Sequence, residues 1–324
     1  MSDQWQVFTE PPPSWEAMCQ AERSLFHTPA WQSLLKRSLR ASPLFVMQSD
    51  GAAAFAVTVF SAGPFRVGYV GFPVGGMLHG APLTAAQLAE LRPLLRRQGI
   101  DRLRLVISPL AFGEALPYPA VALPETAVTN LPAWDLNQLS SSIRRNVNKA
   151  RRSGVQLQDA GLPMHGERLF TLYRQTIARH GGSVRYSAAY FRELASLAGQ
   201  EARLRCLLAA VDDQIVSFVC VGLDGATAYY LHGATDMAYQ HLRPADLLFA
   251  AAITWARDEG MAVYNMLASP ADQPSLVRYK EKWGGETAPQ QTYDLPVRGG
   301  RAALFTWATA VFRTINDIKE RFKS

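Results

Sequence analysis

The spacing of apolar and polar positions predicts a helix, two paired strands, a third strand, a second helix and a fourth strand in the first half of the chain. In that order, the expected elements are residues 28–39, 44–47, 53–60, 65–70, 84–98 and 102–107. Ser49, Asp50 and Gly51 form the turn between the paired strands. Pro93 lies inside the second helix, where a proline removes a backbone hydrogen bond and favours a break.

The second half of the chain repeats this order. Its expected elements are residues 187–197, 204–211, 214–221, 226–231, 244–259 and 261–267. Gly233 is expected to break the third strand, and Pro244 to begin the main helix. Matching positions such as Tyr69 and Tyr229 lie about 160 residues apart, as a duplicated unit requires. The order resembles the core of a GNAT fold. We therefore expect an α/β (α+β) protein of two tandem GNAT-like domains, each a mixed, mostly antiparallel sheet flanked by helices.

Two amphipathic helices lie outside these repeats. Residues 140–154 predict a linker helix with a narrow apolar stripe and a basic face, between domains at residues 1–139 and 155–300. Residues 303–322 predict a C-terminal helix, within the segment 301–324. This second helix either packs on its own domain or makes peripheral contact with a membrane.

Composition narrows the class of protein. The chain has 324 residues, of which 48% are hydrophobic and 19% charged, enough apolar surface for two cores. No apolar run approaches the ~20 residues that span a bilayer. Residues 1–13 lack the features of a signal peptide, so a cytoplasmic location is expected.

The spacing of the cysteines and the net charge indicate which kinds of ligand the protein could bind. Cys19, Cys206 and Cys220 are widely spaced and no zinc-type motif is present, so we expect neither a disulfide framework nor a metal site. The net charge of +6 suits an anionic partner, such as a nucleic acid, a nucleotide-bearing cofactor or a lipid surface.

Three segments resemble the Fem-type branch of the GNAT superfamily. Residues 26–31, Phe-His-Thr-Pro-Ala-Trp, are similar to the family's opening motif. Residues 143–155 are similar to its linker, and residues 279–285, Tyr-Lys-Glu-Lys-Trp-Gly-Gly, to its closing motif. The resemblance implies transfer of an aminoacyl or acyl group to an amine; peptidoglycan-building members take that group from aminoacyl-tRNA.

Two departures from related patterns refine this expectation. Ser108-Pro109 stands where peptidoglycan-type members often have Asp-Pro, which argues against a murein precursor as acceptor. Acetyl-CoA enzymes of the superfamily hold pyrophosphate on a glycine-containing loop before the main helix. Residues 239–244, Tyr-Gln-His-Leu-Arg-Pro, lack those glycines, which argues against conventional CoA binding.

The candidate catalytic residues are Lys280, Asp236 and His241. Lys280 falls on an apolar helix face, where an ammonium needs an anionic partner or loses its charge, and where it could stabilise an oxyanion. Alternatively, its ammonium reaches water along a buried stem. Asp236 and His241 precede the main helix, where a donor would approach, although a loop histidine can equally be a surface residue.

Other residues are candidates for binding. Arg179 and Arg185 flank two glycines and could grip a phosphate or carboxylate. Tyr279 and Trp283 flank Lys280 in the closing motif. Gly75 and Gly76 would let an acceptor approach the backbone. The candidates for phosphate contact share the linker helix: Arg144, Arg145, Lys149, Arg151 and Arg152. Solvated surfaces remain the alternative for the arginines, and a plain loop for the glycines.

The leading hypothesis is a transferase that forms an amide bond, with aminoacyl-tRNA as donor, an amine as acceptor and no tightly bound cofactor. The alternative donor is acyl-CoA or an acyl carrier protein. A hypothesis of another class is a non-catalytic protein that binds nucleic acid or a membrane through its basic face.

Overall fold

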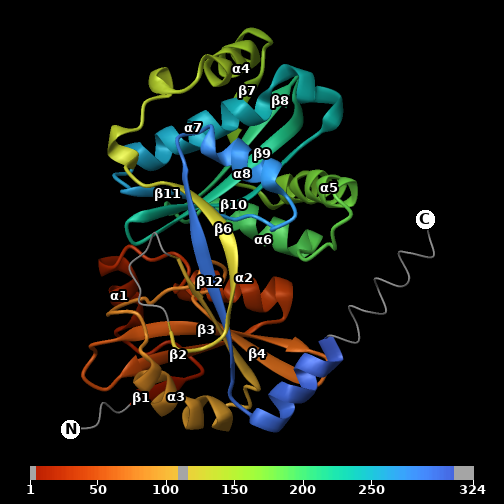
Figure 1. The fold of residues 1–324 in the computed structure, drawn as a ribbon. Coiled ribbons are helices and arrows are strands. Elements are labelled where there is room, and N and C mark those ends of the chain that lie inside the picture. The colour runs from red at the N-terminus through yellow and green to blue at the C-terminus, as the bar shows by residue number, and fades with distance from the viewer. Residues whose placement is uncertain (1–4, 109–115, 310–324) are drawn as a thin grey trace.

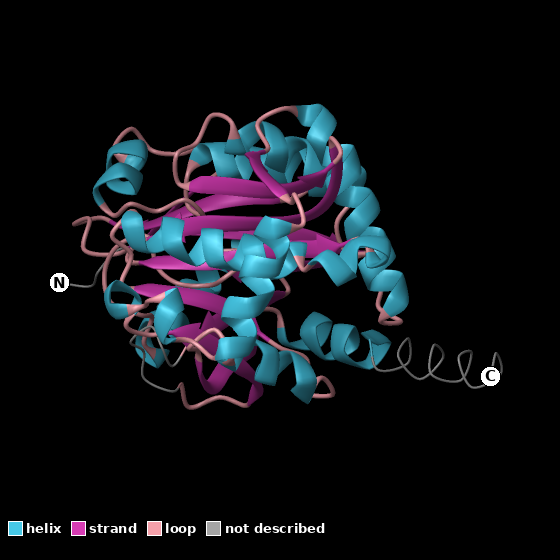
Figure 2. Ribbon diagram, turned by 90° about the horizontal axis from the view of Figure 1, so that it is seen from above, coloured by secondary structure: helices cyan, strands magenta, loops and turns pink. Residues whose placement is uncertain are grey.

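The computed structural model describes residues 5–108 and 116–309. Their strands form one mixed sheet of 12 strands, in the order β1-β2-β3-β4-β5-β12-β6-β11-β10-β9-β8-β7. Helices lie on both faces of this sheet (Figures 1 and 2). Around the strands of the second half, α7 and α4 share a core with one face, whereas α5, α6 and the first-half helix α2 share a core with the other.

The bounds of the elements are as follows. The strands are β1 (Trp5–Phe8), β2 (Ser42–Gln48), β3 (Ala54–Ala62), β4 (Phe65–Val70), β5 (Arg102–Ile107), β6 (Ala120–Val128), β7 (Gln156–Asp159), β8 (Leu204–Val211), β9 (Gln214–Asp224), β10 (Thr227–Thr235), β11 (Val263–Ala268) and β12 (Glu286–Pro296). The α-helices are α1 (Trp15–Ala21), α2 (Pro29–Leu39), α3 (Ala85–Arg97), α4 (Ser141–Arg152), α5 (Pro163–Arg179), α6 (Ala188–Ala198), α7 (Pro244–Asp258) and α8 (Pro274–Glu281). Short 3₁₀ segments are η1 (Leu131–Ala133), η2 (Leu136–Gln138) and η3 (Met237–Leu242).

The two halves repeat one arrangement of strands and helices. Strands β2, β3 and β4 are antiparallel neighbours, and the crossover through α3 makes β5 parallel to β4. Strands β8, β9 and β10 repeat this, and the crossover through α7 makes β11 parallel to β10. The register of the second parallel pair is displaced by one residue relative to the first, since Tyr69 pairs with Arg104 and Tyr229 with Asn265. The expected duplicated order is therefore present in the sheet.

Strands β6 and β12 join the halves into one sheet. β12, from the end of the second half, pairs with β5 of the first half on one side and with β6 on the other, and β6 pairs in turn with β11. Figure 1 shows both strands running through the middle of the molecule. The pattern of the sequence predicted neither strand. Pro124 and Pro289 face each other in this ladder and charged residues interrupt it, so alternation is absent.

The helix expected over residues 84–98 forms, whereas the strand break expected at Gly233 is wrong. Pro93 lies inside the continuous helix α3. Pro93 and Ala89, whose carbonyl loses its helical partner, are both exposed, so water can replace the missing N–H. Strand β10 continues through Gly233 to Thr235, with a register shift between Tyr230 and His232. Only a glycine fits at position 233, because a Cβ there would lie 2.3 Å from the Tyr230 hydroxyl oxygen.

The basic linker helix forms as expected. Ile143, Val147 and Ala150 of α4 are buried and share a hydrophobic core with residues of α7. At the other end of the chain, residues 299–309 are helical and place Phe305 against Phe65 at 5.3 Å between ring centroids. The rest of the expected C-terminal helix, from residue 310, lies outside the described residues.

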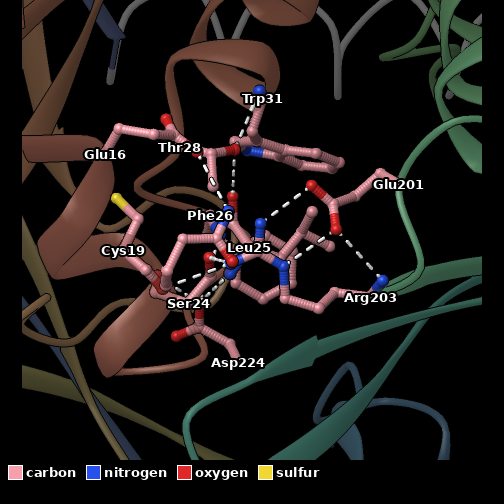
Figure 3. Close-up of polar contacts among 11 residues, drawn as sticks. Glu16, Cys19, Ser24, Leu25, Phe26, Thr28, Trp31, Glu201, Arg203 and Asp224 are labelled. Carbon is pink, nitrogen blue, oxygen red and sulfur yellow. Dashed lines mark hydrogen bonds and ion pairs between the residues drawn. The ribbon is translucent and has the colours of Figure 1, made fainter.

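A joint between the halves is built on the opening motif (Figure 3). Asp224, at the end of β9, accepts hydrogen bonds from the Ser24 hydroxyl at 2.6 Å and from the backbone N–H groups of Leu25 and Phe26 at 2.8 and 3.1 Å. Arg203, on the same half as Asp224, donates to the carbonyl oxygen of Ser24 at 2.5 Å. The loop that precedes α2 is thereby fixed to the second half.

The aromatic residues of the same motif extend the joint. Phe26 lies against Tyr229 of β10, with 5.7 Å between ring centroids. Trp31 is fully buried in α2, and its indole N–H donates to the carbonyl of Phe72 at 3.0 Å. Thr28 caps α2 by accepting from the Trp31 N–H. The opening motif therefore sets the position of β10 relative to the first half.

Candidate functional site

Lys280 is a buried ammonium at the end of β11. The helix α8 presents its side chain to the sheet, where only 4% of the residue is exposed. Its Nζ donates to the carbonyl of Leu267 at 2.7 Å and to the Ser269 hydroxyl at 2.8 Å. Burial lowers the pKa of Lys280 to about 8, and the charge of Glu125 acts in the opposite direction. The side chain is therefore desolvated and does not reach along the surface to water.

The glycines of the closing motif let α8 lie this close to the sheet. Gly284 has a φ of +86°, a left-handed conformation that stops the chain from continuing as a helix after α8. A Cβ on Gly285 would lie 2.6 Å from Thr126 and 2.8 Å from Met266. A larger residue at Gly285 would therefore push α8 and Lys280 away from the sheet.

Tyr279 and Trp283 lie in the core of the second half. Trp283 is fully buried and stacks on Phe249 at 5.4 Å between centroids, and Trp134 donates to its carbonyl. Tyr279 is partly buried and meets the same Phe249 ring edge-on. Both residues therefore hold α8 in place, and Trp283 offers no exposed surface to a substrate.

Polar side chains from β6, β12 and the residue after β5 meet where the two halves join, and one of them, Glu125, acts by its charge on Lys280. Glu125 of β6 is 1% exposed, and its carboxylate accepts from the Gln290 amide of β12 at 2.6 Å and from the Ser108 hydroxyl at the end of β5. These residues lie where the two halves meet in the sheet. The sequence had singled out only Ser108, because β6 and β12 were not expected as strands.

A group of tyrosine side chains from α5, α6 and the loop between them packs around His232 of β10. The hydroxyl of Tyr190 and the Nε2 of His232 are hydrogen-bonded at 2.9 Å, and the ring of Tyr186 lies 4.7 Å from that of His232. Burial lowers the pKa of His232 to about 3, so its imidazole is neutral at pH 7. Burial, with a smaller contribution from Tyr173, raises the pKa of Tyr186 to about 12, against the effect of Arg185. His232 was not among the candidate site residues of the sequence, and its tyrosine neighbours come from distant segments of the chain.

Asp236 and His241 are separate from Lys280. Asp236 caps η3 by accepting from the Ala238 N–H and forms an ion pair with Arg168 at 3.1 Å. His241 is exposed, and its Nδ1 lies 3.0 Å from the Ala238 carbonyl. Both therefore have contacts that hold the turn before α7, and their catalytic assignment gains no support from the geometry.

Arg179 and Arg185 are exposed at the two ends of the loop between α5 and α6. The backbone N–H of Arg185 donates to the Tyr173 hydroxyl at 3.2 Å. The contact fixes the backbone at Arg185 and leaves its guanidinium exposed. An anion-binding role for both residues stays a prediction.

Gly75 and Gly76 lie in a loop that packs against β5. Both have a positive φ, of +85° and +102°. A Cβ on Gly75 would lie 2.6 Å from the carbonyl oxygen of Val106, whereas one on Gly76 would meet nothing within 4 Å. Only Gly76 therefore has open space beside it for an acceptor, and Gly75 is needed for packing.

The Gly75→Ala variant is expected to lose about 2–4 kcal/mol of unfolding free energy, from backbone strain together with the clash on Val106. The Gly76→Ala variant carries strain alone and should lose about 1–2 kcal/mol. Urea unfolding of the two variants measures the difference. Equal losses would contradict the close packing of Gly75 on β5.

The five cations of α4 are exposed, as the amphipathic pattern predicted: Arg144, Arg145, Lys149, Arg151 and Arg152. Arg151 also lines a groove of about 450 Å³ on the second half, with Trp255 and Arg205. None of the residues that line this groove belongs to the Lys280 site. The basic face and the buried ammonium are therefore separate features of the second half.

The N-terminus of α7 carries a buried carboxylate. Asp246, in the first turn, is 7% exposed, and burial raises its pKa while a hydrogen bond from Asn146 of α4 opposes this. A carboxylate in the first turn already complements the helix dipole. A second anion bound at this helix end would be repelled by the negative charge of Asp246.

Two further findings concern metals and membranes. No group of His, Cys, Asp or Glu side chains among residues 5–108 and 116–309 is arranged to hold a metal ion. In the same parts of the chain, none of the helices combines the length and the apolar character needed to cross a bilayer.

Comparisons with known proteins agree with this architecture. Residues 138–281 match the family model described as an acetyltransferase (GNAT) domain. A search of curated protein sequences found no match. The structure of FemX resembles the chain with a TM-score of 0.64 at 13% identity, covering 88% of this chain and 96% of FemX.

Two other solved structures share the fold over similar lengths. L-PGS from Bacillus licheniformis has a TM-score of 0.59 at 13% identity, covering 90% of this chain and 94% of L-PGS. The C-terminal domain of a putative lysylphosphatidylglycerol synthetase from Agrobacterium fabrum has a TM-score of 0.55 at 14% identity, covering 91% and 95% of the two chains. The predicted GNAT-type fold and its likeness to Fem-type proteins are confirmed.

Proposed function

We propose that this chain, whose residues 138–281 match the model of an acetyltransferase (GNAT) domain, is an acyltransferase that moves an aminoacyl group from aminoacyl-tRNA to an amine. The nitrogen of the acceptor forms an amide bond with the carbonyl carbon, and the ester bond to the tRNA ribose breaks. The amine gives up a proton, and the ribose oxygen leaves as a hydroxyl after taking one up. The carbonyl oxygen carries negative charge in between, which is where a fixed cation accelerates the reaction.

Lys280 supplies that cation in this proposal. It is the buried ammonium of the closing motif, and its hydrogen-bond partners are a carbonyl and a hydroxyl. No carboxylate within the described residues lies within 4 Å of it, so its charge is not neutralised by contact. The acceptor would enter between the halves, beside β10 and β11.

The buried Asp246 carboxylate at the N-terminus of α7 is the main observation that favours tRNA over CoA as the donor. A pyrophosphate at this position would lie beside the Asp246 carboxylate, which Asn146 of the linker helix holds by a hydrogen bond. Repulsion of this kind disfavours a CoA donor. A tRNA donor needs no pyrophosphate here, and the exposed cations of α4 suit its phosphate backbone.

The first test offers the purified protein a pool of charged tRNA and, separately, a panel of acyl-CoA thioesters, at two salt concentrations. We expect charged tRNA to bind with strong salt dependence and the thioesters to bind weakly. Binding of thioesters alone would contradict the proposal and favour an ordinary acyl-CoA enzyme. Binding of tRNA without any loss of its aminoacyl group to added amines would favour a non-catalytic protein.

The Arg144→Gln/Arg145→Gln double variant tests whether α4 contacts the tRNA backbone. Removing two phosphate contacts should reduce the slope of log K against log salt by about two. The matched control is Lys36→Gln/Arg97→Gln, which removes two exposed cations from α2 and α3. Filter binding over a salt series gives both slopes, and equal slopes in the two variants would remove α4 from the proposed interface.

A further inference from the structure

Two opposite charges are buried near each other at the seam without touching. The Glu125 carboxylate is bonded by the Gln290 amide and the Ser108 hydroxyl, and the Lys280 ammonium is bonded to a carbonyl and a hydroxyl. Among residues 5–108 and 116–309, neither takes part in an ion pair of 4 Å or less. Buried charges are ordinarily paired or neutralised, so this arrangement needs an explanation.

The pairing of β6 with β11 fixes the positions of both charges at the same place in the sheet. Glu125 of β6 is the register partner of Ala268 in β11. Ala268 lies between Leu267 and Ser269, the two residues that accept hydrogen bonds from Lys280. The Ser269 N–H also donates to the carbonyl of Pro124 at 2.8 Å. A displacement of β6 would therefore move the carboxylate and the anchors of the ammonium together.

We propose that Glu125 is the counter-charge of Lys280, a positioning residue that keeps the lysine protonated in its buried site. The inference deepens the proposed function, because it rests on the ammonium being the group that stabilises the oxyanion. A counter-charge that forms no ion pair with the ammonium leaves the ammonium free to turn toward a substrate.

The electrostatic surroundings support this assignment. Helix α8 packs on β6 and β12. Glu125 is the buried charge on β6, whereas Glu286 of β12 and the α8 residues Arg278 and Glu281 are exposed. Glu125 is also the charged group that raises the pKa of Lys280 against the effect of burial, which holds it at about 8. Without Glu125, burial would act alone and the lysine would lose its proton at a lower pH.

The experiment measures the titration of Lys280 directly by NMR of protein labelled with ¹³C at the lysine Cε. The chain has six lysines, and the signal that disappears in Lys280→Met identifies Lys280. We expect its midpoint to move down by about one pH unit in Glu125→Gln, as for removal of a nearby unit charge in a buried site. Glu125→Asp keeps the charge and should keep most of the wild-type midpoint.

Thr126→Val is the matched control on the same strand. Thr126 is fully buried and bonds the Thr287 hydroxyl at 3.0 Å, so this variant perturbs β6 without changing a charge. Its Lys280 midpoint should stay at the wild-type value. A midpoint in Glu125→Gln that matches the wild type, or one displaced equally in Thr126→Val, would overturn the inference. Circular dichroism confirms that each variant is folded before its titration is compared.

The NMR result needs neither donor nor acceptor, so it is separate from the proposed function. In a transfer assay, Glu125→Gln should also move the alkaline limb of the pH–rate profile to lower pH, by the amount that NMR shows. If Lys280→Met retains full transfer activity, the proposed role of the ammonium fails even where the NMR shift is present. If Lys280→Met is inactive and Glu125→Gln shows no shift of midpoint or limb, the role of Glu125 alone fails.

Discussion

The Lys280→Met variant is expected to transfer acyl groups about 10²–10³-fold more slowly than the wild type, since it lacks the ammonium that the proposed function assigns to the oxyanion. Methionine matches the length of the aliphatic stem, so the packing of α8 on the sheet should remain. The measurement is the transfer rate with saturating donor. Lys282→Met is the matched control, because Lys282 is exposed two residues away and should retain wild-type activity.

The same variant should change how stability depends on pH. The pKa of Lys280 is about 8 in the folded protein against an ordinary value of 10.5, so between these values the unfolded chain binds more protons. The folded wild type therefore bears the full cost of burying the ammonium below pH 8, and its stability rises as the pH approaches 10.5. The whole window is worth roughly 3 kcal/mol.

Lys280→Met lacks this titration, so the difference in unfolding free energy between wild type and variant should move in favour of the wild type from pH 7 to pH 9.5. Urea unfolding of both proteins at the two pH values measures it, and the other titrating groups cancel in the comparison. Parallel pH dependence of the two proteins would show that Lys280 is not desolvated. The expected combination of lost activity and relieved burial cost is typical of a residue kept for function.

Most helices and strands of each half could be predicted from local sequence, because their apolar residues recur at a regular spacing and their ends are marked by capping or turn residues. Thr28 and Pro29 begin α2, and Thr84 begins α3 with a capping box, as such residues do in isolated helices. Tyr69 and Tyr229, which lie about 160 residues apart, occupy corresponding strands of two parallel pairs, β4 with β5 and β10 with β11. Information of this kind is contained in short stretches of sequence, so it could be predicted.

The seam between the halves could not be predicted in this way. Strands β6 and β12 lack alternation, and the partners of β12 lie in both halves of the chain. Glu125 meets Gln290 across 165 positions of sequence, and Tyr190 meets His232 across 42. Lys280 was found from its helical face and its motif. Its neighbours depend on long-range pairing, which periodicity does not report.

The Asp224→Ala variant is expected to lose about 3–5 kcal/mol of unfolding free energy, because it removes the acceptor of three hydrogen bonds at the joint between the halves. Two of the donors are the backbone N–H groups of Leu25 and Phe26, residues that are fully buried. An unpartnered buried N–H keeps its full desolvation cost, which is why the expected loss exceeds that of an ordinary hydrogen bond.

Two comparisons isolate the joint as the cause. Asp224→Asn keeps one side-chain carbonyl and should recover more than half of the loss, whereas Asp258→Ala, which breaks the exposed ion pair with Arg257, should cost less than about 1 kcal/mol. Urea unfolding followed by circular dichroism ranks the three variants. If Asp224→Ala costs no more than Asp258→Ala, the opening motif does not hold the halves together. If it costs as much as expected, transfer activity should fall with it, because Phe26 and Trp31 position β10 and the loop at Phe72 on opposite sides of the seam.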